Sequence, residues 1–207
     1  MEQQHIYVVF SSTPYRIGKF IRKFTGEPYN HVSIALDGEL TQMYGFARRF
    51  YRTPFYGGFV KESLSRYHVN GVSADMCICK LPVTQQQHQD LSRFLEGMYQ
   101  NRKAYPYNHL SAAAAPMRRP VKVRDAYTCV EFCVQVLHDL GVDFHPDKYY
   151  TVGDVEKQLR SYTVYVGPAP PSTQFDYQYY ADKPISHPTY ATLSAIFSLL
   201  KRLLAKK

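Results

Sequence analysis

The chain has 207 residues, a length at which one domain with an appendage is expected, because domains commonly span roughly 100–200 residues. Hydrophobic residues make up 45% of the chain and charged residues 20%, proportions that argue against wholesale disorder. The net charge is +8, and its largest local share lies from Thr192 onward, so we do not expect the body of the chain to bind nucleic acid.

The first predicted elements are a strand, a helix and a hairpin. Residues 6–10 form a short β-rich run that predicts a buried strand, and residues 15–24 carry apolar side chains at helical spacing. Residues 31–36 alternate as a strand does, and Asp37-Gly38 predicts a two-residue hairpin turn. Residues 39–46 would then return antiparallel to residues 31–36.

The remaining elements follow a stretch, residues 47–71, whose richness in Arg, Tyr and Gly predicts a loop. Beyond it, strands and helices mix along the chain. We expect strands at residues 73–81 and 161–166, helices at residues 84–99, 105–116 and 129–140, and a further helix capped by Thr151. A hairpin combined with separate helices predicts an α+β fold.

Gly and Pro residues at positions 167–172 mark a boundary. We therefore divide the chain into a domain at residues 1–166, a Pro- and Tyr-rich irregular segment at 167–191, and a basic amphipathic helix at 192–207. The basic helix suits an anionic membrane surface. The alternative is a helix that packs on the domain and leaves its basic end in solvent.

The four cysteines, Cys77, Cys79, Cys129 and Cys133, are too few for a disulfide scaffold and are poorly spaced for bridging within each close pair. A reducing compartment suits them best. The sequence begins without a signal-peptide pattern and contains no apolar run of the ~20 residues that a membrane span needs. We expect a cytoplasmic protein, with a membrane-peripheral location as the variant. The cysteine spacing does not match the usual zinc sites, so no metal is expected.

Residues Thr128 to Glu131 fit a capping box, in which Ser or Thr caps a helix and Glu or Gln follows three residues later. This places Cys129 in the first turn, where unpaired N–H groups and the positive end of the helix dipole favour a thiolate, the nucleophilic form of cysteine. The alternative is that Cys129 is a small buried apolar residue, which is a common role for cysteine. We expect Cys133, one turn later, to belong to the core.

A thiolate nucleophile needs a base and a group that orients the base. His31 opens the strand predicted at residues 31–36, where its side chain can point at a helix start. His68 and His109 lie in or beside loops and stay open as alternatives. Histidines are more often surface or packing residues, so composition alone does not select His31.

The predicted hairpin supplies an orienting group for His31. With a two-residue turn, His31 faces Tyr44 and Ser33 faces Gln42, and these four side chains share one face of the sheet. Gln42 then lies diagonally across from His31 and can orient its ring through the side-chain oxygen. The alternative for Gln42 is a polar residue on an open sheet face.

Two segments carry a family resemblance. Asn30–Leu36 (NHVSIAL), with a turn and second strand after it, and the later Tyr127–Cys133 (YTCVEFC) resemble the circularly permuted papain-like hydrolases. These have an NlpC-type fold with histidine before cysteine, as in YiiX-like and lecithin:retinol acyltransferase-like proteins. The resemblance covers about residues 5–166. It implies Cys129 as nucleophile, His31 as base and a polar residue of the following strand, best matched by Gln42, as third member, where YiiX-like proteins tend to have an acid.

We predict a thiol hydrolase (amidase, peptidase or thioesterase type) or an acyltransferase, which forms an acyl-enzyme and needs no cofactor. The resemblance suggests a peptide- or lipid-like amide or ester as substrate, and we expect Tyr44 and Ser33 to contact it. The competing class is a non-catalytic binding module that keeps the papain-like fold. A nucleic-acid binder rests only on the pI near 9.2 and the many tyrosines, without a base-reading motif.

Overall fold

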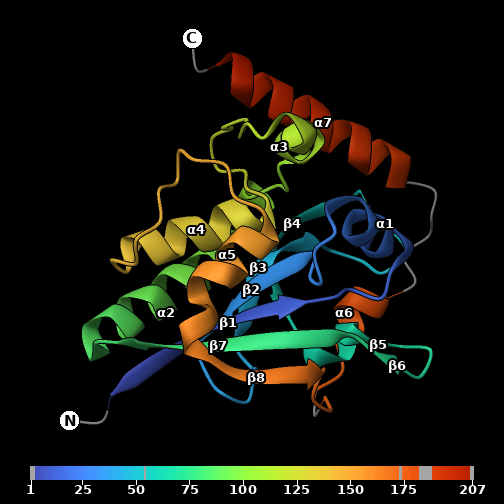
Figure 1. Cartoon of the computed structure of the whole chain (residues 1–207). Coiled ribbons are helices and arrows are strands. Elements are labelled where there is room, and N and C mark those ends of the chain that lie inside the picture. The colour runs from blue at the N-terminus through green and yellow to red at the C-terminus, as the bar shows by residue number, and fades with distance from the viewer. Residues whose placement is uncertain (1–2, 54, 173, 182–187, 206–207) are drawn as a thin grey trace.

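The computed structural model describes the chain except residues 1–2, 54, 173, 182–187 and 206–207. Within the described residues, six strands form one antiparallel sheet in the order β4-β3-β2-β1-β7-β8 (Figure 1). The strands of this sheet are β1 (Gln4–Ser11), β2 (His31–Ala35), β3 (Met43–Arg48), β4 (Gly57–Glu62), β7 (Asp75–Val83) and β8 (Thr163–Pro168). A small hairpin pairs β5 (His68–Val69) with β6 (Val72–Ser73).

The helices lie between and after these strands, which confirms the α+β class. They are α1 (Arg16–Thr25), α2 (Gln85–Gln100), α3 (His109–Ala114), α4 (Cys129–Asp139), α5 (Val152–Leu159), α6 (Tyr177–Tyr180) and α7 (Pro188–Leu204), and a 3₁₀ turn, η1, spans Leu64–Tyr67. The boundaries of α2 and α4 follow their sequence signals closely, because each begins with a complete capping box.

The helices α2, α4 and α5 cover one face of the sheet (Figure 1). Their apolar stripes meet the alternate residues of the strands that face them, as the periods of helix and strand require. At the centre of this core, the ring of Phe132 on α4 lies 5.3 Å from the rings of both Phe46 and Phe59. These contacts fix the start of α4 against β3 and β4.

The opposite face of the sheet carries a second, smaller core. Val9, Met43 and Met76 of the sheet pack there against Leu64 and Tyr67 of η1. The 3₁₀ turn η1 therefore covers this face of the sheet, and β4 ends just before it.

The expectation of a loop throughout residues 47–71 is wrong, because β4 and η1 lie within it. Gly57 and Gly58 within it allow another segment of the chain to approach β4 closely. A Cβ atom on Gly57 would lie 2.9 Å from the Cβ of Tyr107, and one on Gly58 would lie 2.5 Å from the carbonyl oxygen of Tyr105. Glycine at these positions lets residues 105–107 run along the outer edge of β4.

The predicted register of the hairpin is also wrong. Ala35 pairs with Met43 and Ile34 with Tyr44, because the connection is longer than two residues. The Asp37 carboxylate organises this longer loop by accepting the backbone N–H groups of Thr41, at 2.8 Å, and Gln42, at 2.7 Å. The register differs from the predicted one by an odd number of residues, so it places Tyr44 on the opposite face of the sheet from His31.

The final helix α7 packs on α3 (Figure 1). Leu199 is fully buried with Val123 and Ala126, and Arg202 donates hydrogen bonds to the carbonyl oxygens of Ala104 and Arg124. Apolar side chains on another side of α7 stay exposed, namely Leu193, Phe197, Leu200 and Leu204. Among the described residues, no helix has the length and apolar character needed to cross a bilayer.

Candidate functional site

The first turn of α4 is held by a complete capping box. The Thr128 hydroxyl accepts the N–H of Glu131 at 3.2 Å, and the Glu131 carboxylate accepts the N–H of Thr128 at 2.8 Å. Ser111 donates a further hydrogen bond to the Glu131 carboxylate, at 2.5 Å, which ties the cap to α3. Cys129, the first residue of α4, is only 6% exposed, yet it lines two cavities.

His31 is the first residue of β2, and the structure brings it to Cys129. Its Nε2 atom lies 3.1 and 3.2 Å from the two carboxylate oxygens of Glu62 and 3.1 Å from the Ser33 hydroxyl. Burial lowers the pKa of His31, but the Glu62 carboxylate and a hydrogen bond with Cys129 outweigh burial and raise the pKa to about 10. Since Nε2 is engaged by Glu62, Nδ1 is the ring nitrogen left for the sulfur.

Glu62, the last residue of β4, is the partner that the sequence analysis missed. Its buried carboxylate accepts hydrogen bonds from Ser33, at 2.5 Å, and from the phenol of Tyr67, at 2.7 Å. Burial acts to raise the pKa of Glu62, but the charges of His31 and Arg66 dominate and lower it to about 2. The signal in the sequence is the acid that closes the short β-rich run Gly57–Glu62, which lies within the stretch predicted to be a loop.

Gln42 does not take part in this arrangement. It lies ahead of β3 on the solvent side of the hairpin, and its side chain is exposed. Tyr44 is in the core of the opposite face, where its ring stacks on Phe59 and its phenol donates to Glu96 at 3.3 Å. Of the predicted companions of His31, only Ser33 shares its face and contacts it.

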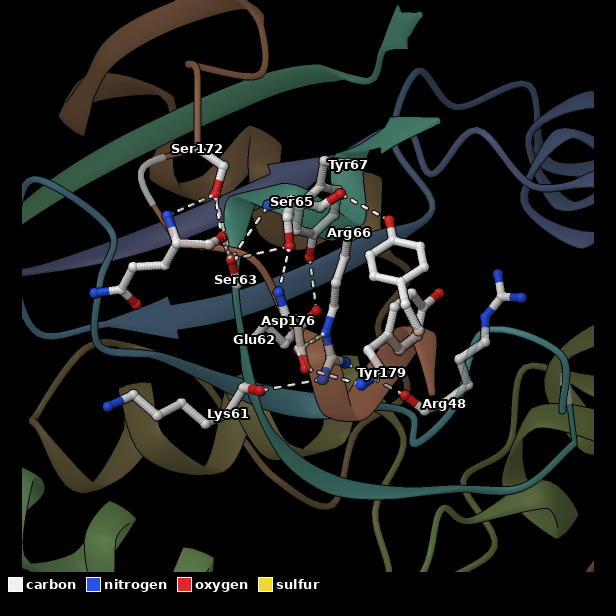
Figure 2. A network of polar contacts seen from close by, with 12 residues as sticks. Arg48, Lys61, Glu62, Ser63, Ser65, Arg66, Tyr67, Ser172, Asp176 and Tyr179 are labelled. Carbon is white, nitrogen blue, oxygen red and sulfur yellow. Dashed lines mark hydrogen bonds and ion pairs between the residues drawn. The ribbon is translucent and has the colours of Figure 1, made fainter. Parts of the chain in front are cut away.

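The positive charge of Arg66 lies near Glu62 and stabilises its carboxylate (Figure 2). Its guanidinium donates to the Asp176 carboxylate at 2.7 Å and to the carbonyl oxygen of Lys61 at 3.2 Å, and it lies 4.3 Å from the centre of the Tyr179 ring. Asp176 and Tyr179 belong to residues 167–191, the segment predicted to be irregular. This segment therefore contributes to the surroundings of Glu62.

Tyr107 is a second residue that the sequence analysis did not single out. Its phenol makes a hydrogen bond with Cys129, and burial together with the charge of Cys129 raises the pKa of Tyr107 well above its usual range. The phenol is consequently neutral and able to donate. The close approach of residues 105–107 to β4, which Gly57 permits, places Tyr107 beside the sulfur.

The two other histidines left open have different surroundings. His68 is engaged by the Ser73 hydroxyl at 2.9 Å and the carbonyl oxygen of Pro170 at 2.8 Å. His109 lines a cavity together with Cys129, and burial lowers its pKa. Within the described part of the chain, no group of three or more His, Cys, Asp or Glu residues is placed to hold a metal ion.

Cys129 lies where two cavities meet. The small cavity, about 260 Å³, is bounded by His31, Glu62, Arg48 and Tyr179 among others. The large cavity, about 650 Å³, extends from Cys129 between α1, α3, α4 and α5. Both volumes share Ile21, Asn30, Tyr107, Ala112 and Cys129 in their walls. A carbonyl group at the sulfur would thus have space on either side.

Comparison with known proteins identified no relative of this chain. No protein-family model, no curated protein and no solved structure matched the chain, so the geometry above carries the functional argument by itself.

Proposed function

We propose that the protein is a cysteine hydrolase of the circularly permuted papain-like type, which acts through Cys129 and His31 with Glu62 as the third member. The observation that carries the proposal is the buried chain of contacts from the helix-start sulfur through His31 to Glu62. It joins a nucleophile, a proton carrier and an orienting anion, as nucleophilic catalysis requires. Glu62 takes the place for which Gln42 had been the best match in the sequence.

The reactive form of the proposed mechanism has the proton of the Cys129 thiol on His31. The sulfur lone pair forms a bond to the carbonyl carbon, and the carbonyl π electrons move onto oxygen. When the carbonyl re-forms, the bond to the leaving nitrogen or oxygen breaks, and the leaving atom takes the proton from Nδ1 of His31. Water then adds to the thioester, His31 accepts its proton, and the acid leaves as the thiolate is restored.

Two donors are available for the negative oxygen of the tetrahedral intermediate. The backbone N–H of Cys129 is one, because first-turn N–H groups have no partner within the helix. The neutral phenol of Tyr107, which already hydrogen-bonds with Cys129, is the other. Ser33 and Tyr67 hold the Glu62 carboxylate in place and are positioning residues.

The test is alkylation by iodoacetamide at about pH 6, where an ordinary thiol with a pKa near 8.5 is almost fully protonated. Cys129 is expected to react much faster than Cys79 and Cys133, and His31→Ala is expected to slow it at least tenfold. Modification must be followed for each cysteine by peptide mass spectrometry. A hydrogen bond with Cys79 lowers the pKa of Cys77 to about 7, so Cys77 is the internal competitor.

The outcome also decides between the enzyme and a non-catalytic binding module of the same fold. A binding module needs no reactive thiolate, so equal rates at Cys129 and at the core residue Cys133 would end the hydrolase proposal. Glu62→Gln is the second variant. It removes the anion but keeps the shape of the side chain, and it is expected to slow labelling of Cys129 without unfolding the protein.

A further inference from the structure

We propose that the substrate is an amide with an apolar acyl part and a small leaving amine that bears a free carboxylate, as in an N-acylated amino acid or the last peptide bond of an apolar peptide. The inference rests on the proposed function and adds to it the class of substrate. In the reaction, the amide and one water become a carboxylic acid and a free amino acid. No oxidant, reductant or cofactor is needed for this balance.

The orientation of the substrate in the two cavities follows from the position of His31, which supplies a proton to the leaving group. The leaving nitrogen must receive the proton, so the leaving group has to lie on the His31 side of the sulfur. His31 lines the small cavity but not the large one. The leaving amine therefore occupies the small cavity and the acyl part occupies the large one.

The sizes of the cavities agree with this orientation. About 260 Å³ corresponds to the volume of roughly nine water molecules at ~30 Å³ each, enough for a group of amino-acid size. The large cavity, at about 650 Å³, lies in the range of roughly 300–1,000 Å³ found for ligand sites. An acyl group larger than the leaving amine fits this pair of volumes.

The large cavity has mainly apolar walls along its length. Tyr29, Val134 and Pro116 are among its lining residues, and Phe20 of α1 also lines it although 71% of its surface is exposed. A large apolar side chain left in solvent at a cavity is common at ligand-binding surfaces. Three of its four charged lining residues are already engaged, since Glu131 belongs to the capping box, Glu27 accepts the N–H of Gly153 at 2.9 Å and Arg118 lies 3.9 Å from Asp154. The fourth, Lys148, is exposed to solvent.

Arg48 gives the small cavity its preference for an anion. Its guanidinium lies 3.6 Å from the centre of the Tyr15 ring and donates one long hydrogen bond, 3.3 Å, to the carbonyl oxygen of Tyr51. None of the ion pairs among the described residues involves Arg48. A planar guanidinium matches a carboxylate with two parallel hydrogen bonds.

The other charges that line the small cavity cancel one another. Glu62 is paired with His31, and Arg66 is paired with Asp176. Arg48 is left as the uncompensated charge in this wall. A leaving group with a carboxylate would balance it, whereas a neutral amine would leave it unpaired and a cationic amine would be repelled.

The experiment compares kcat/KM for three amides: N-dodecanoylglycine, its neutral counterpart N-dodecanoylglycinamide, and N-acetylglycine as the short-chain control. The kcat/KM for N-dodecanoylglycine is expected to exceed that for N-dodecanoylglycinamide roughly 10–100-fold, the range of one charge-assisted interaction. It is also expected to exceed the kcat/KM for N-acetylglycine by a similar factor. A tetrapeptide of apolar residues ending in glycine distinguishes a fatty acyl from a peptidyl source.

Two variants assign these preferences to the cavities. Arg48→Gln is expected to bring the kcat/KM for N-dodecanoylglycine close to that for N-dodecanoylglycinamide. Arg48→Lys is expected to retain part of the preference for the carboxylate, because lysine keeps the charge but loses the paired geometry. Phe20→Asp is expected to reduce the preference for the long acyl chain. Phe94→Asp is its matched control, because Phe94 is also exposed on a helix but lines neither cavity.

The neutral ester 4-nitrophenyl acetate separates failure of the substrate class from failure of the enzyme. A burst of nitrophenol that Cys129→Ser abolishes, combined with no preference for the carboxylate or no amide hydrolysis, overturns the substrate class alone. Absence of both the burst and the fast alkylation of Cys129 overturns the proposed function and this inference with it.

Discussion

Glu62 is a buried carboxylate whose partners come from two other segments of the chain. His31 and Ser33 of β2 and Tyr67 of η1 all contact it. A buried charge is tolerated only when such partners replace its hydration, so the fold has to hold them together. The same contacts that stabilise the carboxylate orient the imidazole toward Cys129.

The pair of His31 and Glu62 should make stability depend on pH in a defined window. The pKa of His31 rises from 6.5 to about 10 on folding, so its contribution is complete below pH 6.5 and is lost as the pH rises toward 10. The pKa of Glu62 falls from 4.5 to about 2, so its contribution is complete above pH 4.5 and is lost as the pH falls toward 2.

The difference in unfolding free energy between the wild type and His31→Gln is therefore expected to be largest between pH 4.5 and 6.5 and to shrink at pH 8 and again at pH 10. Urea titrations at these pH values measure it. A difference that stays constant from pH 5.5 to 10 would contradict the ion pair.

Gly45 is a glycine that the site requires. Its backbone would accept alanine, but a Cβ atom there would lie 2.8 Å from Oε1 of Glu62 and 3.1 Å from the Ser33 hydroxyl. Gly45→Ala is expected to displace the carboxylate, to destabilise the fold by about 1–3 kcal/mol through overpacking, and to slow alkylation of Cys129.

Gly97 offers the matched control for this substitution. It is exposed in α2, and an added Cβ there would meet nothing within 4 Å outside the backbone of its own stretch of helix. Gly97→Ala should stabilise the protein by about 0.5–1 kcal/mol and leave the labelling rate of Cys129 unchanged. Equal labelling in both variants would remove the role assigned to the space at Gly45.

At the scale of elements, the start of α4 combines stability with chemistry. Thr128 fixes the first turn, and this turn presents both the sulfur and the backbone N–H of Cys129. The helix α2 begins with an equivalent capping box, built by Thr84 and Gln87, but its first residue is Gln85 instead of a cysteine. A comparison of the two caps therefore separates the effect of a capping box on stability from its effect on the reactivity of Cys129.

Thr128→Ala and Thr84→Ala are each expected to lower the unfolding free energy by about 0.5–2 kcal/mol, because each removes an N-cap. Only Thr128→Ala is expected to slow alkylation of Cys129, since the first turn of α4 then frays. Denaturation curves and labelling rates of both variants provide the check. A loss of labelling in the Thr84 variant as well would show a general effect of stability.

At the scale of the whole molecule, a segment near the C-terminus closes one side of the site. Asp176 binds the guanidinium of Arg66, and the Tyr179 ring lies against it (Figure 2). The Tyr179 phenol also donates to the phenol of Tyr15 at 2.8 Å. Tyr15 and Tyr179 also line the small cavity. Residues distant in sequence thus complete a wall that the domain assigned to residues 1–166 does not build alone.

Asp176→Ala should destabilise the protein strongly, by roughly 3–5 kcal/mol, because it leaves the guanidinium of Arg66 buried without its partner. The side chains of this pair are 7% and 12% exposed. Asp90→Ala breaks the exposed pair with Arg93 and serves as the control, with little change expected. Thermal and urea unfolding compare the two variants, and similar losses in both would contradict a central role for Arg66.

The helix α7 uses one side to bury Leu199 and leaves Leu193, Phe197 and Leu204 in solvent. Association with an anionic membrane stays a prediction for this exposed side. We expect weak co-sedimentation with anionic vesicles that salt abolishes and that deletion of residues 190–207 removes. Sedimentation unaffected by salt or by the deletion would exclude α7 as the contact.

The sequence by itself determined the local features, because capping and periodicity depend on neighbours in the chain. The helix start at Cys129, the strand start at His31, the α+β class and most element boundaries follow from such patterns. The tertiary structure alone decided which distant groups meet. An aspartate-organised loop reset the hairpin register and excluded Gln42, and the end of β4 supplied Glu62 instead. Tyr107 and Arg66 reached the site through close approach and long-range pairing, which no local pattern encodes.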